Sequence, residues 1–142
     1  MYTAIQIADY IVARCINNGT PISNLQLNKI LFFIQKCFLN INKDGLFVDD
    51  FEAWQFGPVV PSVYYRYCGF GGASILLRPR EVVELKPLES YYIDPIIDEK
   101  SKKNPWELVQ ETHQKNGAWA CIYKDGSGNH IIIPKELIKL LG

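Results

Sequence analysis

Apolar residues near the start of the chain recur with the period of an amphipathic helix. From Ala4 to Cys15 they fall at i, i+3, i+4, i+7, i+8 and i+11, which places them on one helical face. Thr3 and Gln6 have the spacing of a capping box, and Asn17-Asn18-Gly19 contains residues that tolerate the left-handed conformation at a helix end. The pattern predicts a first helix with one buried side.

A second helix is predicted to be more deeply buried than the first. Ser23 and Gln26 form another capping box, and Lys43-Asp44-Gly45 is expected to end the helix. Phe32, Phe33 and Leu39 lie outside the main apolar stripe, which consists of Leu27, Ile30, Leu31, Ile34, Phe38 and Ile41. A helix that is apolar nearly all round is typical of a central position in a fold.

The next segment predicts a rigid corner. Phe51 to Phe56 has the character of a short strand, which Gly57-Pro58 should end because proline fixes φ and lacks an N–H. Pro61 is suited to open a helix that runs through Tyr67. We expect the indole of Trp54 to be buried where this corner closes.

The C-terminal half is less regular. Residues 75–92 could form a strand or an irregular crossing. Asp94-Pro95 and Asn104-Pro105 each pair a capping residue with proline, which predicts two helix starts, the second helix running to about Asn116. Residues 118–124 allow a short helix or the first arm of a hairpin, and Pro134 opens a last helix. Altogether the sequence predicts a mainly α fold with minor β structure around the central helix.

Composition indicates one globular domain spanning residues 1–142. Hydrophobic residues make up 48% of the chain, and 15 basic residues balance 15 acidic ones. Zero net charge leaves no excess with which to release counterions from DNA or to bind an anionic membrane. We expect a cytoplasmic protein, because no signal peptide and no membrane-spanning run is visible. The cysteines are scattered and are expected to fill the core.

Candidate chemistry is sparse. His113 is expected to form a hydrogen bond beside Trp106, and His130 to be exposed in a loop. No serine or cysteine lies in a recognisable nucleophile motif, and Glu107 and Glu111 are expected to be solvated charges, because no pair of histidines accompanies them. The sequence therefore predicts no catalytic residue, no metal site and no cofactor.

Tyrosines are the better indication of function. Tyr64 and Tyr65 are adjacent on a short predicted helix, and Tyr91 and Tyr92 form a second adjacent pair. A short helix cannot bury Tyr64, Tyr65 and Tyr67 in one direction, so we expect the 64/67 side to pack on the core and Tyr65 to face solvent. Exposed tyrosine offers a large, rigid contact area and is enriched at binding hot spots. The four residues Tyr64, Tyr65, Tyr91 and Tyr92 are the predicted partner-binding residues.

Several motifs carry a family resemblance. The chain has L-x-K-[LI]-L-x-[FY] at residues 27–33, then A-W-x-x-G-P-V at residues 53–59, then Thr112-His113 followed by Trp119. This order resembles the SocA-like antitoxin, or Panacea, domain, which is also similar to phage-associated GepA-type proteins. The positions that match the motifs are Lys29, Trp54, Gly57, Pro58, Val59, His113 and Trp119.

The resemblance implies an antitoxin that binds and neutralises a cognate toxin protein. It implies either simple sequestration or delivery of the toxin to a Clp-type protease, with the motif residues forming scaffold and groove. A DNA-binding regulator of a mobile-element operon is the alternative, and zero net charge argues against it. A hydrolase that uses His113 is a third hypothesis. We expect no nucleic acid and no membrane partner for the protein alone.

Overall fold

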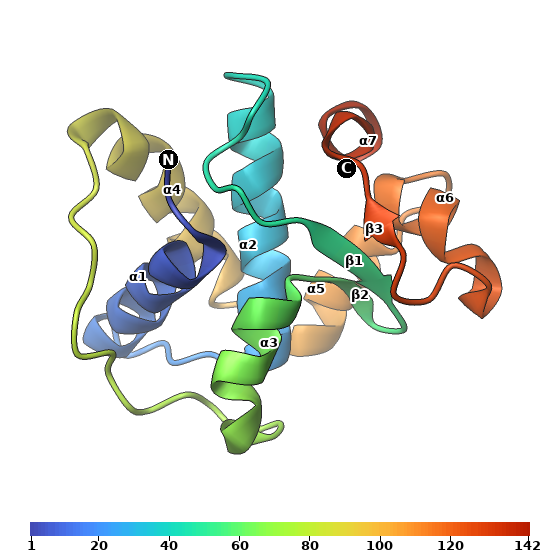
Figure 1. Ribbon diagram of the computed structural model, residues 1–142. Coiled ribbons are helices and arrows are strands. Elements are labelled where there is room, and N and C mark those ends of the chain that lie inside the picture. The colour runs from blue at the N-terminus through green and yellow to red at the C-terminus, as the bar shows by residue number, and fades with distance from the viewer.

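A computed structural model describes all 142 residues and shows helices arranged around one central helix. The helix α2 (Asn24–Leu39) runs through the middle of the molecule, with α1 (Ala4–Asn17) and α4 (Pro87–Lys100) on one side (Figure 1). The remaining helices are α3 (Pro61–Tyr67), α5 (Pro105–Thr112), α6 (Ala118–Tyr123) and α7 (Lys135–Leu141), and there are short 3₁₀ turns at Cys68–Phe70 and Lys124–Gly126. The fold is mainly α with minor β, as predicted.

Local sequence explains why α1 and α2 begin where they do. Both predicted capping boxes form: Thr3 pairs with Gln6, and Ser23 pairs with Gln26. Each box satisfies backbone N–H groups that have no partner inside the helix. Most of α2 is buried, because α1, α3, α4, α5 and α7 all pack against it. The prediction of a central buried helix is confirmed.

The β structure is a small antiparallel sheet with the strand order β2-β1-β3. Strand β1 (Phe51–Trp54) pairs with β2 (Gly57–Val59) and with β3 (Ile132–Ile133). The prediction that Gly57-Pro58 simply ends the extended segment is wrong. Gly57 lies at φ +116°, so the chain reverses at Gln55-Phe56 and continues as a second strand, with Trp54 opposite Gly57.

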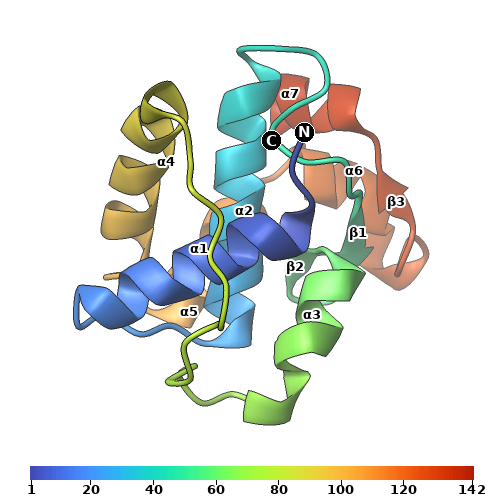
Figure 2. The same ribbon diagram turned by 60° about the vertical axis from the view of Figure 1, so that its left-hand side comes forward.

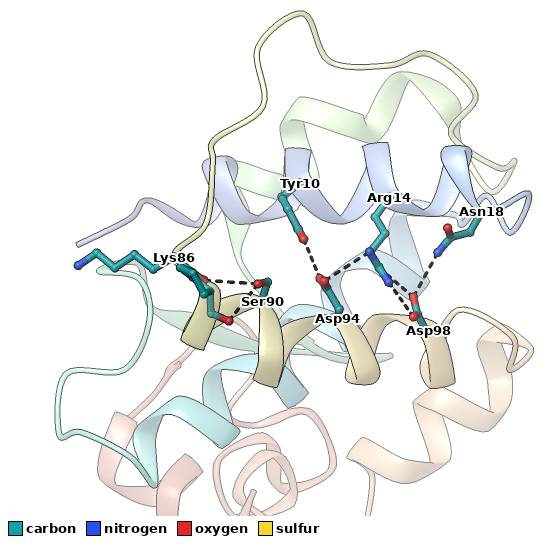
Figure 3. Close-up of polar contacts among 8 residues, drawn as sticks. Tyr10, Arg14, Asn18, Lys86, Ser90, Asp94 and Asp98 are labelled. Carbon is teal, nitrogen blue, oxygen red and sulfur yellow. Dashed lines mark hydrogen bonds and ion pairs between the residues drawn. The ribbon is translucent and has the colours of Figure 1, made fainter.

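The predicted helix start at Asp94-Pro95 is also wrong, because Pro95 lies inside α4. The helix opens at Pro87 instead, and Glu89 Oε1 accepts a hydrogen bond from the backbone N–H of Lys86 at 2.9 Å. Hydrogen bonds from α1 hold this helix along its length, including Tyr10 to Asp94 and Arg14 to Asp98 (Figure 3). Pro95 has no N–H, so α4 lacks one backbone hydrogen bond there. The helix nevertheless continues through the proline, and the contacts with α1 hold it in place.

The remaining helix and strand boundaries decide between the alternatives that the sequence left open. Residues 75–86 form an irregular crossing, with Ile75 anchored by a backbone hydrogen bond to Ile22. Helix α5 starts at Pro105 after the Asn104 cap, as predicted, but ends at Thr112. Residues Ala118–Tyr123 are helical, and Ile132–Ile133 nevertheless pairs with β1. The last helix follows Pro134, as predicted.

Candidate functional site

The motif residues from three separate segments converge where α2 meets the β1–β2 hairpin. Lys29 on α2 is fully buried, and its Nζ donates a hydrogen bond to the carbonyl of Pro58 at 2.9 Å. Asn28, the residue before Lys29 on α2, accepts a hydrogen bond from the Val60 N–H at 3.0 Å. Strand β2 and the residue after it are therefore fixed to α2 by side chains.

Gly57 is required by the close approach of α2 and α5 to this hairpin. A Cβ at position 57 would lie 2.6 Å from Lys29 Cε and 2.8 Å from Thr112 Oγ1. Real Cβ contacts are longer than this, and the positive φ of Gly57 is unfavourable for other residues. The G-P-V part of the motif thus allows the lysine to pass beneath the strand.

His113 and Trp119 form the other half of the motif cluster. Their rings stack with centroids 3.6 Å apart and an interplanar angle of 4°, and Trp119 Nε1 donates to the Trp54 carbonyl at 2.8 Å. Burial lowers the pKa of His113, the Lys29 charge lowers it further, and a backbone hydrogen bond with Phe56 opposes these effects. The prediction that His113 lies beside Trp106 is wrong, because Trp106 contacts Phe56 instead.

Trp54 is half-buried, which corrects the expectation of a fully buried indole. One of its neighbours is His130, which stacks at 4.5 Å between centroids, and another is Tyr64 at 4.9 Å. The indole N–H donates to Glu52 Oε1 at 3.0 Å. Trp54 is therefore held by a hydrogen bond at its edge while part of the ring remains accessible.

A cavity of about 420 Å³ opens beside Trp54. Its apolar lining comes from α2, the hairpin and α3, and includes Leu25, Trp54, Phe56, Val59 and Tyr64. Its polar lining includes Asn24, Asn28, Lys29, Asn129 and His130. A largely apolar pocket of this size with a few fixed polar groups is typical of a binding site. We call it the Trp54 cavity.

The two tyrosine pairs lie in different places. Tyr67 is buried and Tyr65 is 64% exposed, as the helix faces predicted, whereas Tyr64 is 36% exposed and lines the Trp54 cavity. Tyr91 and Tyr92 lie on α4, which packs on another part of α2 (Figures 1 and 2). The four predicted partner-binding tyrosines thus do not form one continuous surface.

Sequence reasoning missed several residues of this site. Phe56 and Trp106 are both substantially exposed and stack edge to face at 5.5 Å, and Phe56 belongs to the cavity lining. Had β2 been predicted from the sequence, Phe56 would have been placed in a two-residue hairpin turn, and its exposure would have been expected. His130 reaches Trp54 through a loop in which its own φ is +67°, and no local pattern predicts that path.

Other candidate groups have structural roles. Glu111 was expected to be solvated, but it is half-buried and accepts hydrogen bonds from Lys100 at 2.6 Å and Lys103 at 3.0 Å. Cys15 is buried as expected, whereas Cys68 is exposed and corrects the core assignment. No group of three or more His, Cys, Asp or Glu side chains is arranged to hold a metal ion.

Comparison with known proteins agrees with the motif geometry. Residues 27–120 match the family described as Antitoxin SocA-like, Panacea domain. Antitoxin SocA of Caulobacter vibrioides (strain NA1000 / CB15N) is 28% identical over 136 residues, covering 88% of this chain and 72% of that relative. No solved structure gives a significant match.

The chain therefore belongs to the SocA-like, Panacea domain family of antitoxins. Membership supports an antitoxin role, implies a toxin as partner and suggests a role without enzymatic activity. The matched region begins at Leu27 and ends at Ala120, so it contains the hydrogen bonds of Asn28 and Lys29 to the hairpin region and the stack of His113 on Trp119. None of the helices has the length and apolar character needed to cross a membrane.

Proposed function

We propose that this protein neutralises its cognate toxin by binding it directly, with the Trp54 cavity and the adjoining Tyr65 as the docking surface. The observation that supports this most is the position of the cavity. It lies beside the motif cluster, and exposed aromatic groups of Tyr65, Phe56 and Trp106 adjoin it. Aromatic anchors around a preformed pocket are the usual source of binding energy at an interface.

The arrangement of groups supports a binding role over a catalytic one. Binding needs a surface that keeps its shape, and Asn24, Asn28 and Lys29 fix the cavity through hydrogen bonds to Tyr64, Val60 and Pro58. His113, the one histidine of the motif, is packed flat on Trp119. Sequestration needs only this surface, whereas delivery to a Clp-type protease would need a second one.

The test is to fill the cavity without touching the motif cluster. Asn129 is exposed and lines the cavity, so Asn129→Trp should block it with little effect on folding. Asn17→Trp, at the exposed end of α1, is the matched control. We expect cells that co-express the toxin, identified as the product of the neighbouring gene, to be rescued by the control and not by Asn129→Trp.

Purified proteins then separate binding from folding. Loss of toxin binding by Asn129→Trp, with an unchanged melting temperature, is the expected result. Full rescue and wild-type affinity in a folded Asn129→Trp variant would show that the toxin docks elsewhere.

A further inference from the structure

The three strands of the sheet contain one charged residue, Glu52. It lies directly opposite Val59 of β2 and Ile132 of β3, and opposite residues of antiparallel strands share a face of the sheet. Trp54, two residues further along β1, lies on that face too. We call this the outer face, because β1 alternates buried residues with the half-buried Glu52 and Trp54. Val59 also lines the Trp54 cavity, so Glu52 adjoins the proposed docking surface.

The Glu52 carboxylate is accessible on this face. Its neighbour Ile132 is 50% exposed. One carboxylate oxygen accepts the indole N–H of Trp54 at 3.0 Å, and the other accepts no hydrogen bond from the protein. The buried side-chain oxygen and nitrogen atoms without a partner belong to Glu111 and His113, so the second oxygen of Glu52 is open to solvent. A donor that approaches the outer face can therefore reach it.

No basic group of the protein neutralises Glu52. None of the ion pairs within 4.0 Å includes this residue. Lys135, three residues after Ile132, donates instead to the Val48 carbonyl at 3.0 Å. The outer face thus presents an uncompensated carboxylate between apolar and aromatic side chains, which calls for a cation with apolar character.

An arginine side chain fits these surroundings better than a lysine side chain. Its planar guanidinium can donate two parallel hydrogen bonds to a carboxylate, its flat faces stack on aromatic rings, and it is more weakly hydrated than an ammonium group. Its aliphatic stem can cover apolar surface such as that of Ile132. A partner that covered Ile132 and Trp54 without supplying a cation would leave the Glu52 charge desolvated and unpaired, which is costly.

We propose that the outer face of the sheet extends the docking surface and receives an arginine side chain of the toxin, with its guanidinium on the Glu52 carboxylate and its stem against Ile132 and Trp54. This inference rests on the proposed function for the identity of the partner. The recognition chemistry itself belongs to the sheet and can be measured without the toxin.

The experiment uses three peptides that differ in one side chain. Acetyl-Phe-Ala-Arg-amide presents a guanidinium, the citrulline peptide replaces it with a neutral urea of nearly the same shape, and the lysine peptide presents an ammonium group. In an extended peptide the phenylalanine shares a face with the tested side chain, so it can enter the Trp54 cavity. The chemical shifts of the Trp54 indole N–H and of backbone amides in β1 and β3 report binding. We expect the arginine peptide to bind about fivefold more tightly than the citrulline peptide at low salt, with the lysine peptide between them.

Glu52→Gln removes the charge and keeps the geometry. The side-chain oxygen of glutamine can still accept the indole N–H of Trp54, so the ring should keep its position, and the arginine and citrulline peptides should bind equally. Glu84→Gln is the matched control, because Glu84 is an exposed carboxylate on the 75–86 crossing and its loss changes the net charge equally. It should leave the preference for arginine intact. Added salt should weaken binding of the arginine peptide and not of the citrulline peptide.

Three outcomes would overturn the proposal: equal binding of the arginine and citrulline peptides, no binding of any peptide at millimolar concentration, or a preference for arginine that survives in Glu52→Gln. A lysine peptide that binds as tightly as the arginine peptide would overturn the choice of a guanidinium. The comparison of peptides on the wild-type protein stands even if Glu52→Gln does not fold.

Toxin binding distinguishes this inference from the proposed function. Glu52→Gln should weaken toxin affinity about tenfold with an unchanged melting temperature, whereas Glu84→Gln should not change it. If Glu52→Gln binds the toxin normally while Asn129→Trp fails, the docking surface is correct and the arginine contact is not. If Asn129→Trp binds normally while Glu52→Gln fails, the outer face receives the toxin and the cavity does not.

Discussion

The two tyrosine pairs of this protein look alike in sequence and differ in their surroundings. In each pair the rings meet edge to face, at 5.5 Å for Tyr64–Tyr65 and 5.3 Å for Tyr91–Tyr92. In each pair one ring is largely exposed and the other is partly covered. The Tyr64 backbone bonds to Asn24 near the start of α2, whereas Tyr92 packs on Phe38 near its end, about 20 Å further along the helix.

Concavity and fixed polar groups separate the two pairs. Tyr64 lines the Trp54 cavity beside a buried lysine, while Tyr92 covers Phe38, and its helix α4 is held to α1 by a row of polar contacts (Figure 3). Exposure of aromatic rings alone therefore does not distinguish the two pairs, whereas the cavity beside Tyr64 does. The following variants disturb one side of this comparison at a time, beginning with the largest expected effect.

Gly57→Ala should disrupt the cavity side most strongly. The added Cβ would clash with Lys29 and Thr112 in a backbone conformation that alanine adopts poorly. We expect a loss of about 3 kcal/mol in the free energy of unfolding, or roughly 10 °C in Tm. Thermal and urea denaturation provide the measurement.

Gly69→Ala is the matched control for that variant. Position 69 has open space around it and an ordinary φ, so the substitution should change stability by less than about 0.5 kcal/mol. Equal stability of the two variants would mean that Lys29 does not pass beneath Gly57 as the structure shows.

Tyr65→Ala should separate the two tyrosine pairs in function. Tyr65 is exposed beside the cavity, so its loss should leave Tm within about two degrees. It should weaken toxin binding by about 2 kcal/mol, roughly thirtyfold, if it acts as an aromatic anchor. Tyr91→Ala, at a similarly exposed ring on α4, should leave the affinity nearly unchanged. Calorimetric titration of the toxin into the three proteins checks both expectations, and a larger effect at Tyr91 would reverse our assignment.

The sequence predicted elements that depend on local spacing. The two capping boxes, the apolar face of α1 and the buried α2 are each determined by residues within a few turns of one another. The resemblance implied that Lys29, Gly57 and His113 are scaffold and groove-forming residues. It could not show how, because the fit of the lysine under Gly57 depends on the long-range contact between α2, the hairpin and α5.

Elements that depend on distant partners were predicted less well. Pro95 indicates a helix start when only its neighbours are considered, and the contacts of Tyr10 and Arg14 with Asp94 and Asp98 are invisible in the local pattern. The cavity lining illustrates the same point, since His130 comes from a loop far along the chain. Short-range rules therefore predicted the scaffold better than the site.

The ionisation of Lys29 should make the stability of the cavity side depend on pH. The folded protein holds this group at a pKa of about 7, below its ordinary value of 10.5 in an unfolded chain. Between pH 7 and 9 the unfolded state therefore binds more protons, and the free energy of unfolding should rise with pH by about 2 kcal/mol. Above pH 9, the raised pKa of Cys15 should oppose the rise.

Lys29→Met tests the origin of that dependence. Methionine fills a similar volume without a titratable group, so the rise between pH 7 and 9 should disappear in urea denaturation series. A rise of the same size in the variant would show that another group is responsible.

Arg14→Gln should weaken the α4 side and leave the cavity side intact. The Arg14 guanidinium forms a two-pronged contact with Asp98, at 2.9 Å from Nε and 2.8 Å from Nη2, and Nη1 lies 3.4 Å from Asp94. The group is 30% exposed, so solvent and salt reduce the contribution of the pair to about 1 kcal/mol. We expect a stability loss of that size in urea denaturation, and a smaller loss at high salt. The loss is limited because the hydrogen bond between Tyr2 and Glu89 still joins the start of the chain to α4. The stability of Arg14→Lys, which keeps the charge and loses the planar fork, should fall between those of the wild-type protein and Arg14→Gln.

Toxin affinity should stay at the wild-type value in both variants, because α4 contributes no residue to the Trp54 cavity. Weakened toxin binding by a folded Arg14→Gln variant would instead place α4, with Tyr91 and Tyr92, in the interface.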